Sequence, residues 1–339
     1  MREAAFIADH SLLYHYTSED GLLGIIEHDN IWATHVRYLN DYTEFREAFQ
    51  ERFVGVLMDS FLAGLPEGLD RTARPVIEGV LSKRNVPQLL KGIESSGSTN
   101  ETFVCSFVGG ADSIPQSGSN PGDRLSQWRG YSHSSQGFSL GFDRVLLEKQ
   151  IRIDNSRCKR SLHKCIYEDN EKSKFFQEMG RKASDHFANL TLNGGSVPEW
   201  FRTNRPDAPE EYKRLNSYFL LSLAKATADF FTAAAQIKDC GFGEECEWRI
   251  VSHRNKLSPE IVKFRKGQFG LTPFIEVPLS LTKPEISSLR RIVVGPSAHK
   301  EDIKHSVELL LQKHGIQVRR PDTNDGVMVR TSLIPYRSA

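Results

Sequence analysis

One histidine near the start of the chain has the surroundings of a binding residue. His15 stands between Tyr14 and Tyr16 in a short run that favours a strand, and an apolar pattern of helical spacing follows at residues 21–28. A neutral imidazole can donate one hydrogen bond to a sugar hydroxyl and accept another. The alternative is a histidine satisfied inside the fold, because a single titratable residue is only a probabilistic marker of a site.

Two carboxylates late in the chain, Glu245 and Glu247, precede Arg249. Alternate residues of a strand share a face, so a strand through this segment would place both acids and Arg249 together. Paired carboxylates need a cation or raise each other's pKa. A carboxylate of this kind can stabilise positive charge that develops on a sugar ring. An exposed acidic turn is the alternative, and alternation does not choose between the two acids.

A third cluster, Trp128, Arg129 and Tyr131, follows the Gly- and Pro-rich segment 109–124. Arginine can bind a pyrophosphate with two hydrogen bonds, and an aromatic side chain can stack on a flat ring. Core packing of the two aromatic residues, with the arginine paired to an acid, is the alternative. The pattern favours a polar turn at 125–131 that leads into a strand at 137–143.

The order of elements predicts an α+β fold with a mostly antiparallel sheet, because strands and helices do not alternate regularly. We expect one domain over residues 1–339, with a lid-like loop near 109–124 and an inserted helical and loop region near 171–237. Strands are expected at 13–18, 30–35, 102–107, 137–143 and 247–251.

Composition excludes several classes of protein. The 44 Lys+Arg and 43 Asp+Glu residues give a formal net charge of +1, so nucleic acid would need a local basic patch. Five cysteines without Cys-x-x-Cys spacing predict neither a disulfide framework nor a zinc site, and we expect no metal. No apolar signal core or membrane span is predicted, which favours a cytoplasmic protein. Walker, Rossmann and nucleophile-elbow motifs are absent from the sequence.

The ordered motifs resemble a bacterial family catalogued as domain of unknown function 2971, and the resemblance runs nearly end to end. They are Tyr14-His15-Tyr16-Thr17-Ser18, Trp32-Ala33-Thr34-His35, Leu39-Asn40-Asp41 with Glu44-Phe45, Ser126-Gln127-Trp128-Arg129-Gly130-Tyr131, Gly137-Phe138-Ser139-Leu140-Gly141-Phe142, Glu245-Cys246-Glu247-Trp248-Arg249 and Ile334-Pro335-Tyr336-Arg337. The opening motif is also similar to that of proteins with the ADP-ribosyltransferase fold, in which a histidine, an aromatic residue and a glutamate form the site.

That resemblance implies a split sheet that holds NAD as a co-substrate. His15 would match the first-strand histidine, Glu247 the late glutamate, with Glu245 as the other acid, and Trp128 or Tyr131 the aromatic residue. Further NAD-binding residues would be Tyr16, Thr17 and Arg129.

The implied function is that of an ADP-ribosyltransferase acting on a protein or nucleic-acid acceptor. A toxin, effector or phage-defence role, with an antitoxin or defence-system partner, is implied with it. An NAD glycohydrolase, or a non-enzymatic module that binds a nucleotide or a partner, remains an alternative.

Overall fold

The computed structural model describes residues 12–39, 52–67, 71, 74–75, 77, 102–110, 120–131, 136–153, 158–193, 209–211, 213–222, 235–253, 259–267, 270–320 and 325–335. Two compact units contain them. Unit 1 comprises Met1–His35, Phe103–Cys165 and Gly241–Ala339, and unit 2 comprises Val36–Thr102 and Ile166–Cys240. The organisation as one domain with an insertion stays a prediction. Most of the predicted lid, residues 111–119, lies outside the described residues.

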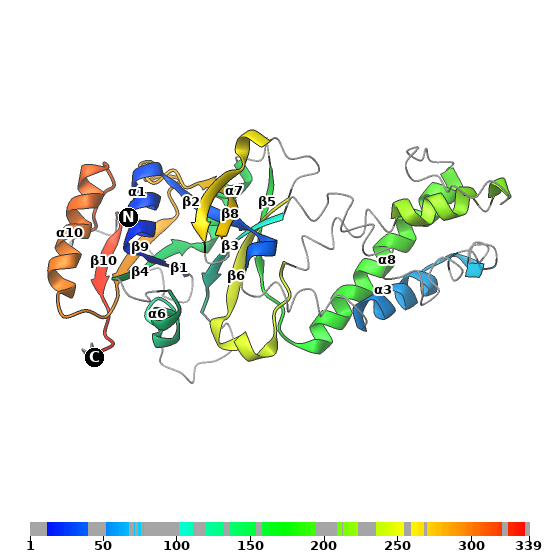
Figure 1. Ribbon diagram of the computed structural model, residues 1–339, viewed down its shortest axis with the longest axis horizontal. Helices are drawn as coiled ribbons and strands as arrows, with labels where there is room; N and C mark the ends of the chain where they lie inside the picture. Colours follow the sequence, from blue (N-terminus) through cyan, green and yellow to red (C-terminus); the bar gives the residue numbers. More distant parts are fainter. Residues whose placement is uncertain are drawn as a thin grey trace, which may run out of the picture. The chain divides into compact units, whose positions relative to one another are not determined.

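A ten-stranded sheet organises unit 1 (Figure 1). Its main path runs β10-β9-β4-β1-β3-β2-β8-β7, while β6 pairs with both β3 and β5. The strands are β1 (Leu12–Ser18), β2 (Asn30–His35), β3 (Thr102–Val108), β4 (Gly137–Asp143), β5 (Lys159–Lys164), β6 (Glu247–His253), β7 (Lys263–Gly267), β8 (Gly270–Pro278), β9 (Leu289–Val294) and β10 (Met328–Thr331).

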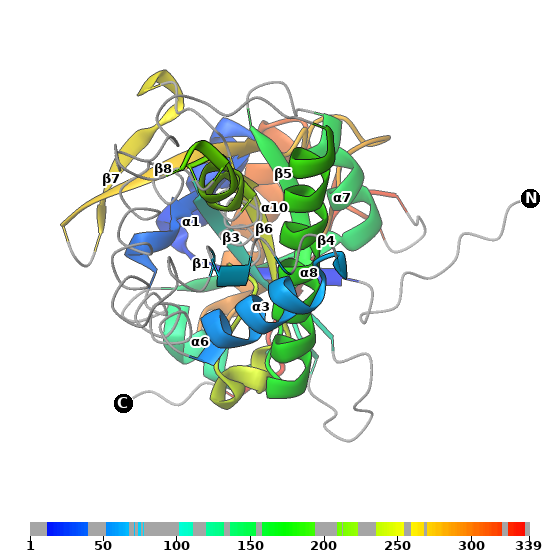
Figure 2. The same ribbon diagram turned by 90° about the vertical axis from the view of Figure 1, so that its right-hand side faces the viewer.

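The sheet is mostly antiparallel, which confirms the predicted α+β class. The pairs β1–β4, β4–β9, β2–β8 and β7–β8 are antiparallel, whereas β10 runs parallel to β9. The hairpin of β7 and β8 forms one edge of the sheet (Figure 2). At the other end, helix α10 (Lys300–Lys313) packs beside β10 (Figure 1).

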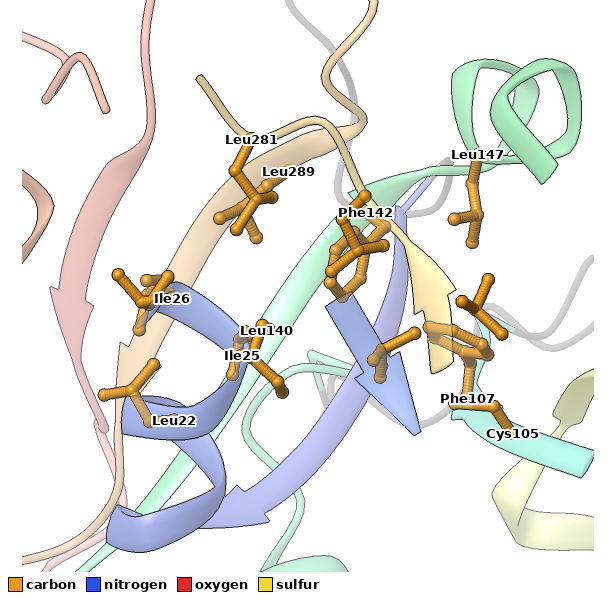
Figure 3. Packing of buried hydrophobic residues seen from close by; sticks show 14 of the residues in the cluster. Leu22, Ile25, Ile26, Cys105, Phe107, Leu140, Phe142, Leu147, Leu281 and Leu289 are labelled. Carbon is orange, nitrogen blue, oxygen red and sulfur yellow. The ribbon is translucent and has the colours of Figure 1, made fainter. Parts of the chain in front are cut away.

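Helix α1 (Glu19–His28) follows β1 without a loop. Ser18 adopts extended backbone angles, and its side-chain oxygen accepts a hydrogen bond from the Gly21 amide at 3.3 Å, so it caps the helix as the sequence predicts. Leu22, Ile25 and Ile26 recur at the spacing of one helix face and are all buried. Figure 3 shows these three side chains in the core near Leu140 of β4.

Alternation along the strands separates two apolar clusters. Leu13, Cys105, Phe107 and Leu140 belong to the main core on one face. A smaller cluster on the other face of β1 contains Leu12, Tyr14, Tyr16, Val108, Trp128 and Val293. Tyr16 and Leu13 therefore lie on opposite faces of β1, and this separation matters for the candidate site.

Strand β3 contacts three other strands. It pairs with β1 only at Tyr14–Val108, and with β2 at Thr34–Val104 and His35–Phe103. It also pairs with β6. The residues of β3 that precede Val108 therefore form no ladder with β1, and their backbone groups need other partners.

Unit 2 contains the helices α3 (Arg52–Ala63) and α8 (Asp169–Asn193) and the short helix η2 (Val36–Tyr38). Phe61 of α3 is fully buried, with its ring centroid 5.7 Å from that of Phe187 and 5.3 Å from that of Phe219. The two helices approach closely because Gly180 of α8 lies against the backbone of Leu57. In the described part of the chain, no helix is long and apolar enough to cross a membrane.

Candidate functional site

His15 lies where β1 leaves β3. Its Nδ1 atom is 3.0 Å from the carbonyl oxygen of Ser106, a β3 residue outside the single ladder pair of the two strands. Its ring centroid lies 5.7 Å from that of Phe107. The side chain is partly buried. The imidazole thus satisfies a backbone carbonyl that β1 does not reach.

This contact fixes which imidazole nitrogen carries the proton. A carbonyl oxygen can only accept, so Nδ1 must donate and the neutral ring has its lone pair on Nε2. Burial lowers the pKa of His15, the Ser106 hydrogen bond opposes that shift, and the charge of Arg265 reinforces it. The neutral form therefore dominates at neutral pH. Nε2 has no partner among the described residues and can accept a hydrogen bond.

Cys105, the neighbour of Ser106 on β3, lies near both His15 and Glu247. Its sulfur is 3.9 Å from His15 Nδ1. Burial raises the pKa of the Cys105 thiol, and the negative charge of Glu247 raises it further. Glu247 is therefore within electrostatic range of Cys105. His15 of the first strand thus contacts Cys105, and β6, the late strand that contains Glu247, pairs with β3.

Glu247 forms a buried ion pair with Arg249. Both side chains are about 5 % exposed, and Arg249 donates from Nε to Glu247 Oε1 at 2.7 Å and from Nη2 to Oε2 at 3.1 Å. The two residues are alternate members of β6 and share a face, as the sequence predicts. The two-point geometry fixes the carboxylate and supplies the cation that a buried acid requires.

Glu245 does not share this arrangement, which corrects the expected strand alternation. It ends the short helix η5 (Cys240–Glu245), and β6 begins only at Glu247. Between them Cys246 adopts a left-handed backbone with φ of 46°. This turn breaks the period-two relation, so the strand places only Glu247 beside Arg249. The catalytic assignment of either acid stays a prediction.

The predicted aromatic residues lie on the face of β1 opposite to His15. Trp128 is buried, and its ring meets that of Tyr16 edge-on at 4.7 Å. Tyr131 is half-exposed, with its ring centroid 6.5 Å from that of Tyr16. Because Tyr16 and His15 alternate along the strand, the structure does not bring either aromatic residue to His15.

Segment 125–131 is helix α6 (Leu125–Tyr131), not the polar turn that its sequence indicates. Asp123, just before it, explains how the helix is held. One Asp123 oxygen accepts from Trp128 Nε1 at 2.8 Å and from the Ser332 hydroxyl at 2.5 Å, and the other accepts from the Leu333 amide at 2.7 Å. The indole of Trp128 therefore has a structural partner.

The hydroxyl of Tyr16 holds the segment before α6. It donates to the Pro121 carbonyl at 2.8 Å and accepts from the Arg124 amide at 3.0 Å. Burial raises the pKa of Tyr16, so the phenol stays protonated. The side chain of Arg124 donates to the carbonyls of Glu244 and Gly109. Tyr16 therefore has a clear structural role here.

The remaining predicted residues are Thr17 and Arg129, which belong to β1 and α6 respectively. The Thr17 hydroxyl lies against Gly21 at the start of α1, where no Cβ would fit. Arg129 is exposed on α6, whose buried side chains are Gln127 and Trp128. Among the described residues, neither of them forms a hydrogen bond or an ion pair with His15 or Glu247, and their part in binding stays a prediction.

Sequence reasoning missed Arg265 and Trp32. Arg265 of β7 is exposed, yet its charge influences the pKa of both His15 and Cys105. Its Nη2 atom donates to Thr34 Oγ1 at 2.9 Å, and its guanidinium carbon lies 5.7 Å from the centroid of the Trp32 ring. The basic run 263–266 was the available signal, but nothing in it shows that β7 pairs with β8, the neighbour of β2.

The sheet thus carries an acceptor nitrogen on β1, a fixed carboxylate on β6 and an exposed cation on β7. The acceptor can meet a hydroxyl, the carboxylate can stabilise positive charge, and the cation can meet an anion. Among the described residues, no group of three or more His, Cys, Asp or Glu side chains could hold a metal ion.

Fold and site thus define an α+β protein with an open, mostly antiparallel sheet and a polar cluster around its central strand. Residues 127–250 match the model of a family described as Protein of unknown function (DUF2971), which supports the family assignment made from the motifs. The match includes Trp128 and Glu247 but not His15. Neither a curated protein nor a solved structure matches the chain.

Proposed function

We propose that the protein is an NAD-dependent ADP-ribosyltransferase whose site lies where β1 separates from β3. The observation that carries this proposal is that His15 contacts Cys105 and Ser106 of β3, the strand with which β6, the strand of Glu247, also pairs. The single ladder pair between β1 and β3 is consistent with a split sheet. The motif resemblance assigns the same two residues to NAD.

The chemistry would use each residue at a stated atom. Nε2 of His15 accepts a hydrogen bond from a ribose hydroxyl and orients the sugar. The bond between ribose and nicotinamide breaks with its electron pair leaving on nicotinamide, and the carboxylate of Glu247 stabilises the oxocarbenium-like ribose. An acceptor nucleophile then bonds to the ribose carbon and releases its proton to water. Arg249 positions the carboxylate throughout.

Incubation of the full chain with radiolabelled NAD and whole-cell extract tests the proposal. Wild type should release nicotinamide and label a macromolecule. Glu247→Gln and His15→Gln should each lower the rate about a hundredfold or more, since loss of one electrostatic contact to a transition state has that size. Glu245→Gln is the matched control, because it removes the same charge two residues away from a different backbone environment.

Each outcome has a definite meaning. Nicotinamide release without labelling identifies water as the acceptor and makes the protein an NAD glycohydrolase. Full activity in Glu247→Gln, with circular dichroism unchanged, contradicts the assigned carboxylate. Absence of both release and labelling in wild type contradicts the proposal as a whole.

The Glu247–Arg249 ion pair favours one second candidate, a module that binds a nucleotide without turnover. Both carboxylate oxygens already accept hydrogen bonds from Arg249, which occupies part of their capacity to meet a sugar. This candidate predicts that calorimetry detects ADP-ribose binding while NAD stays intact over hours.

A further inference from the structure

Strand β7 is an edge of the sheet in the described part of the chain. Its residues Lys263–Gly267 pair with β8 alone, and β8 pairs with β2 only from Phe274 onward. The first residues of β8, 270–273, therefore lie beyond the ladder with β2, and Figure 2 shows this hairpin at the outer side of the sheet. An edge strand presents backbone groups that can pair with another extended chain.

The register of the hairpin identifies the backbone groups of β7 that point outward. Phe264 pairs with Pro273, which has no N–H to donate, so this pair is of the type without hydrogen bonds. The two types alternate along an antiparallel ladder, so the pair of Lys266 with Leu271 is of the same type. The N–H and C=O groups of Phe264 and Lys266 therefore point away from β8.

The charged side chains of β7 are all cationic. Lys263, Arg265 and Lys266 are exposed, and the strand contains no acid. Lys263 pairs with Glu276 of β8 at 2.7 Å, whereas neither Arg265 nor Lys266 has an acidic partner among the described residues. Arg265 instead donates to the hydroxyl of Thr34 at 2.9 Å, so its charge is not neutralised there.

The opposite face of the hairpin carries exposed apolar side chains. Phe264 is 59 % exposed, and Leu271, which lies diagonally across the hairpin from it, is 67 % exposed. Lysine on an edge strand commonly serves only to prevent unwanted pairing, but apolar side chains beside an open edge favour pairing. The combination therefore suits an edge that excludes most strands and admits one class of partner.

We propose that β7 binds an acidic extended segment of another protein, which joins the sheet as an added strand. The outward backbone groups of Phe264 and Lys266 form its hydrogen bonds. Arg265 attracts an acid on one face, and Phe264 contacts an apolar side chain on the other. A second copy of the chain does not fit, because the cations of two β7 strands would face each other. The proposal is independent of NAD chemistry.

Amide hydrogen exchange of the full chain, followed by NMR, tests this proposal with a peptide of about eight residues in which Glu alternates with Val. Such a strand has its acids on one face and its valines on the other. With peptide at about ten times its dissociation constant, exchange at the Phe264 and Lys266 amides should slow about tenfold. The Arg265 amide already donates to β8 and should change little.

Two controls test the backbone hydrogen bonds. The same peptide with N-methyl groups along its backbone keeps its charge but cannot complete a ladder, so it should not protect the two amides. Phe264→Pro removes one outward donor without removing a bond to β8, and it should weaken binding more than Phe264→Ala, which keeps the N–H. Equal protection by the N-methylated peptide would overturn the added strand.

Further variants test the charge selection. Arg265→Gln should raise the dissociation constant about two- to fivefold, the size of one exposed ion pair. Lys266→Gln removes the same charge from the other face of β7 and should raise it less. A peptide with Lys in place of Glu should not bind, and equal affinity for both peptides would contradict the selection of acids.

Three further outcomes would also overturn the proposal. One is the absence of protection in the wild-type protein at any peptide concentration. Another is binding of a single-stranded RNA oligonucleotide without binding of the acidic peptide, which would make β7 a nucleic-acid interface. The third is a concentration-dependent dimer in which the Phe264 and Lys266 amides are protected without peptide. Circular dichroism checks that each variant is folded.

Discussion

A single hydrogen bond determines the tautomer of His15. Because Ser106 can only accept, the imidazole is held as one tautomer, and its second nitrogen is left to accept from another group. Sequence spacing could suggest that His15 lies on a strand. It could not indicate this tautomer, since the partner carbonyl belongs to a strand that is distant in the sequence.

The lowered pKa of His15 makes stability depend on pH. The unfolded chain gains a proton near the ordinary pKa of 6.5, whereas the folded protein gains it only at lower pH. The folded state should therefore be fully stabilised above pH 6.5 and lose stability as pH falls from there through the folded pKa. Urea unfolding at several pH values checks this.

His15→Gln should weaken this pH dependence, because glutamine does not titrate and its amide can still donate to Ser106. His163 also has a pKa lowered mainly by burial, so part of the dependence should remain. An identical pH profile in His15→Gln would contradict the assignment of the effect to His15.

Removal of one member of the buried ion pair should be costly. Arg249→Met removes the cation that donates to both oxygens of the buried Glu247 carboxylate, and we expect a loss of about 3–5 kcal/mol in the free energy of unfolding. Arg152→Met is the control, because its pair with Glu148 is exposed and should cost less than about 1 kcal/mol. Equal losses of unfolding free energy in the two variants would show that burial does not increase the contribution of the Glu247–Arg249 pair.

At the scale of elements, the 120–124 segment connects parts of unit 1 that are distant in the sequence. The Tyr16 hydroxyl forms hydrogen bonds with the backbone of Pro121 and Arg124 in this segment. The Asp123 carboxylate accepts hydrogen bonds from α6 and from the residues that follow β10. The base of the predicted lid is thus fixed on β1 at one side and on the C-terminal segment at the other.

Asp123→Ala should destabilise unit 1 by about 3 kcal/mol or more, because its carboxylate accepts three hydrogen bonds and each bond to a charged group contributes about 1.5–3 kcal/mol. Hydrogen exchange at the Leu333 amide should also become faster. Glu148→Ala serves as the comparison, since its exposed carboxylate has one i,i+4 partner. Unchanged Leu333 protection would contradict this role of Asp123.

Local sequence patterns predicted some elements and missed others for identifiable reasons. β1 and α1 were predictable because alternation, a serine cap and helical spacing agree over consecutive residues. α6 was missed because a seven-residue helix with Ser, Gln, Arg and Gly has weak propensity and depends on Asp123 and Tyr16. The prediction that Glu245 and Glu247 share a face was wrong because Cys246, which lies between them, has a left-handed backbone.

At the scale of the whole molecule, the class of fold was predictable but the neighbours of β3 were not. Irregular alternation of strands and helices sufficed for an α+β fold. Arg265 was missed because β7 and β8 join β2 across more than two hundred residues, a pairing that no local pattern encodes. The aromatic residue assigned by resemblance proved to lie on the other face of β1 from His15.

The late strands should be essential for unit 1 to fold. A chain that ends at residue 258 lacks β7 to β10, and with them the core residues Ile275, Val277, Ile292 and Val294. Burial of one such side chain contributes about 1.5–3 kcal/mol, so we expect no cooperative thermal transition for its near-ultraviolet signal. A sharp transition in this fragment would show that the core is formed by the earlier strands alone.

The fixed tautomer of His15 also gives the candidate site a direction. Nε2 repels anions and can accept a hydrogen bond from a hydroxyl or amide group. A ligand with a donor at one end and an acceptor at the other can therefore approach Nε2 only with its donor end. The polarity of the ligand group that meets Nε2 would then contribute to specificity, independently of the shape of any pocket.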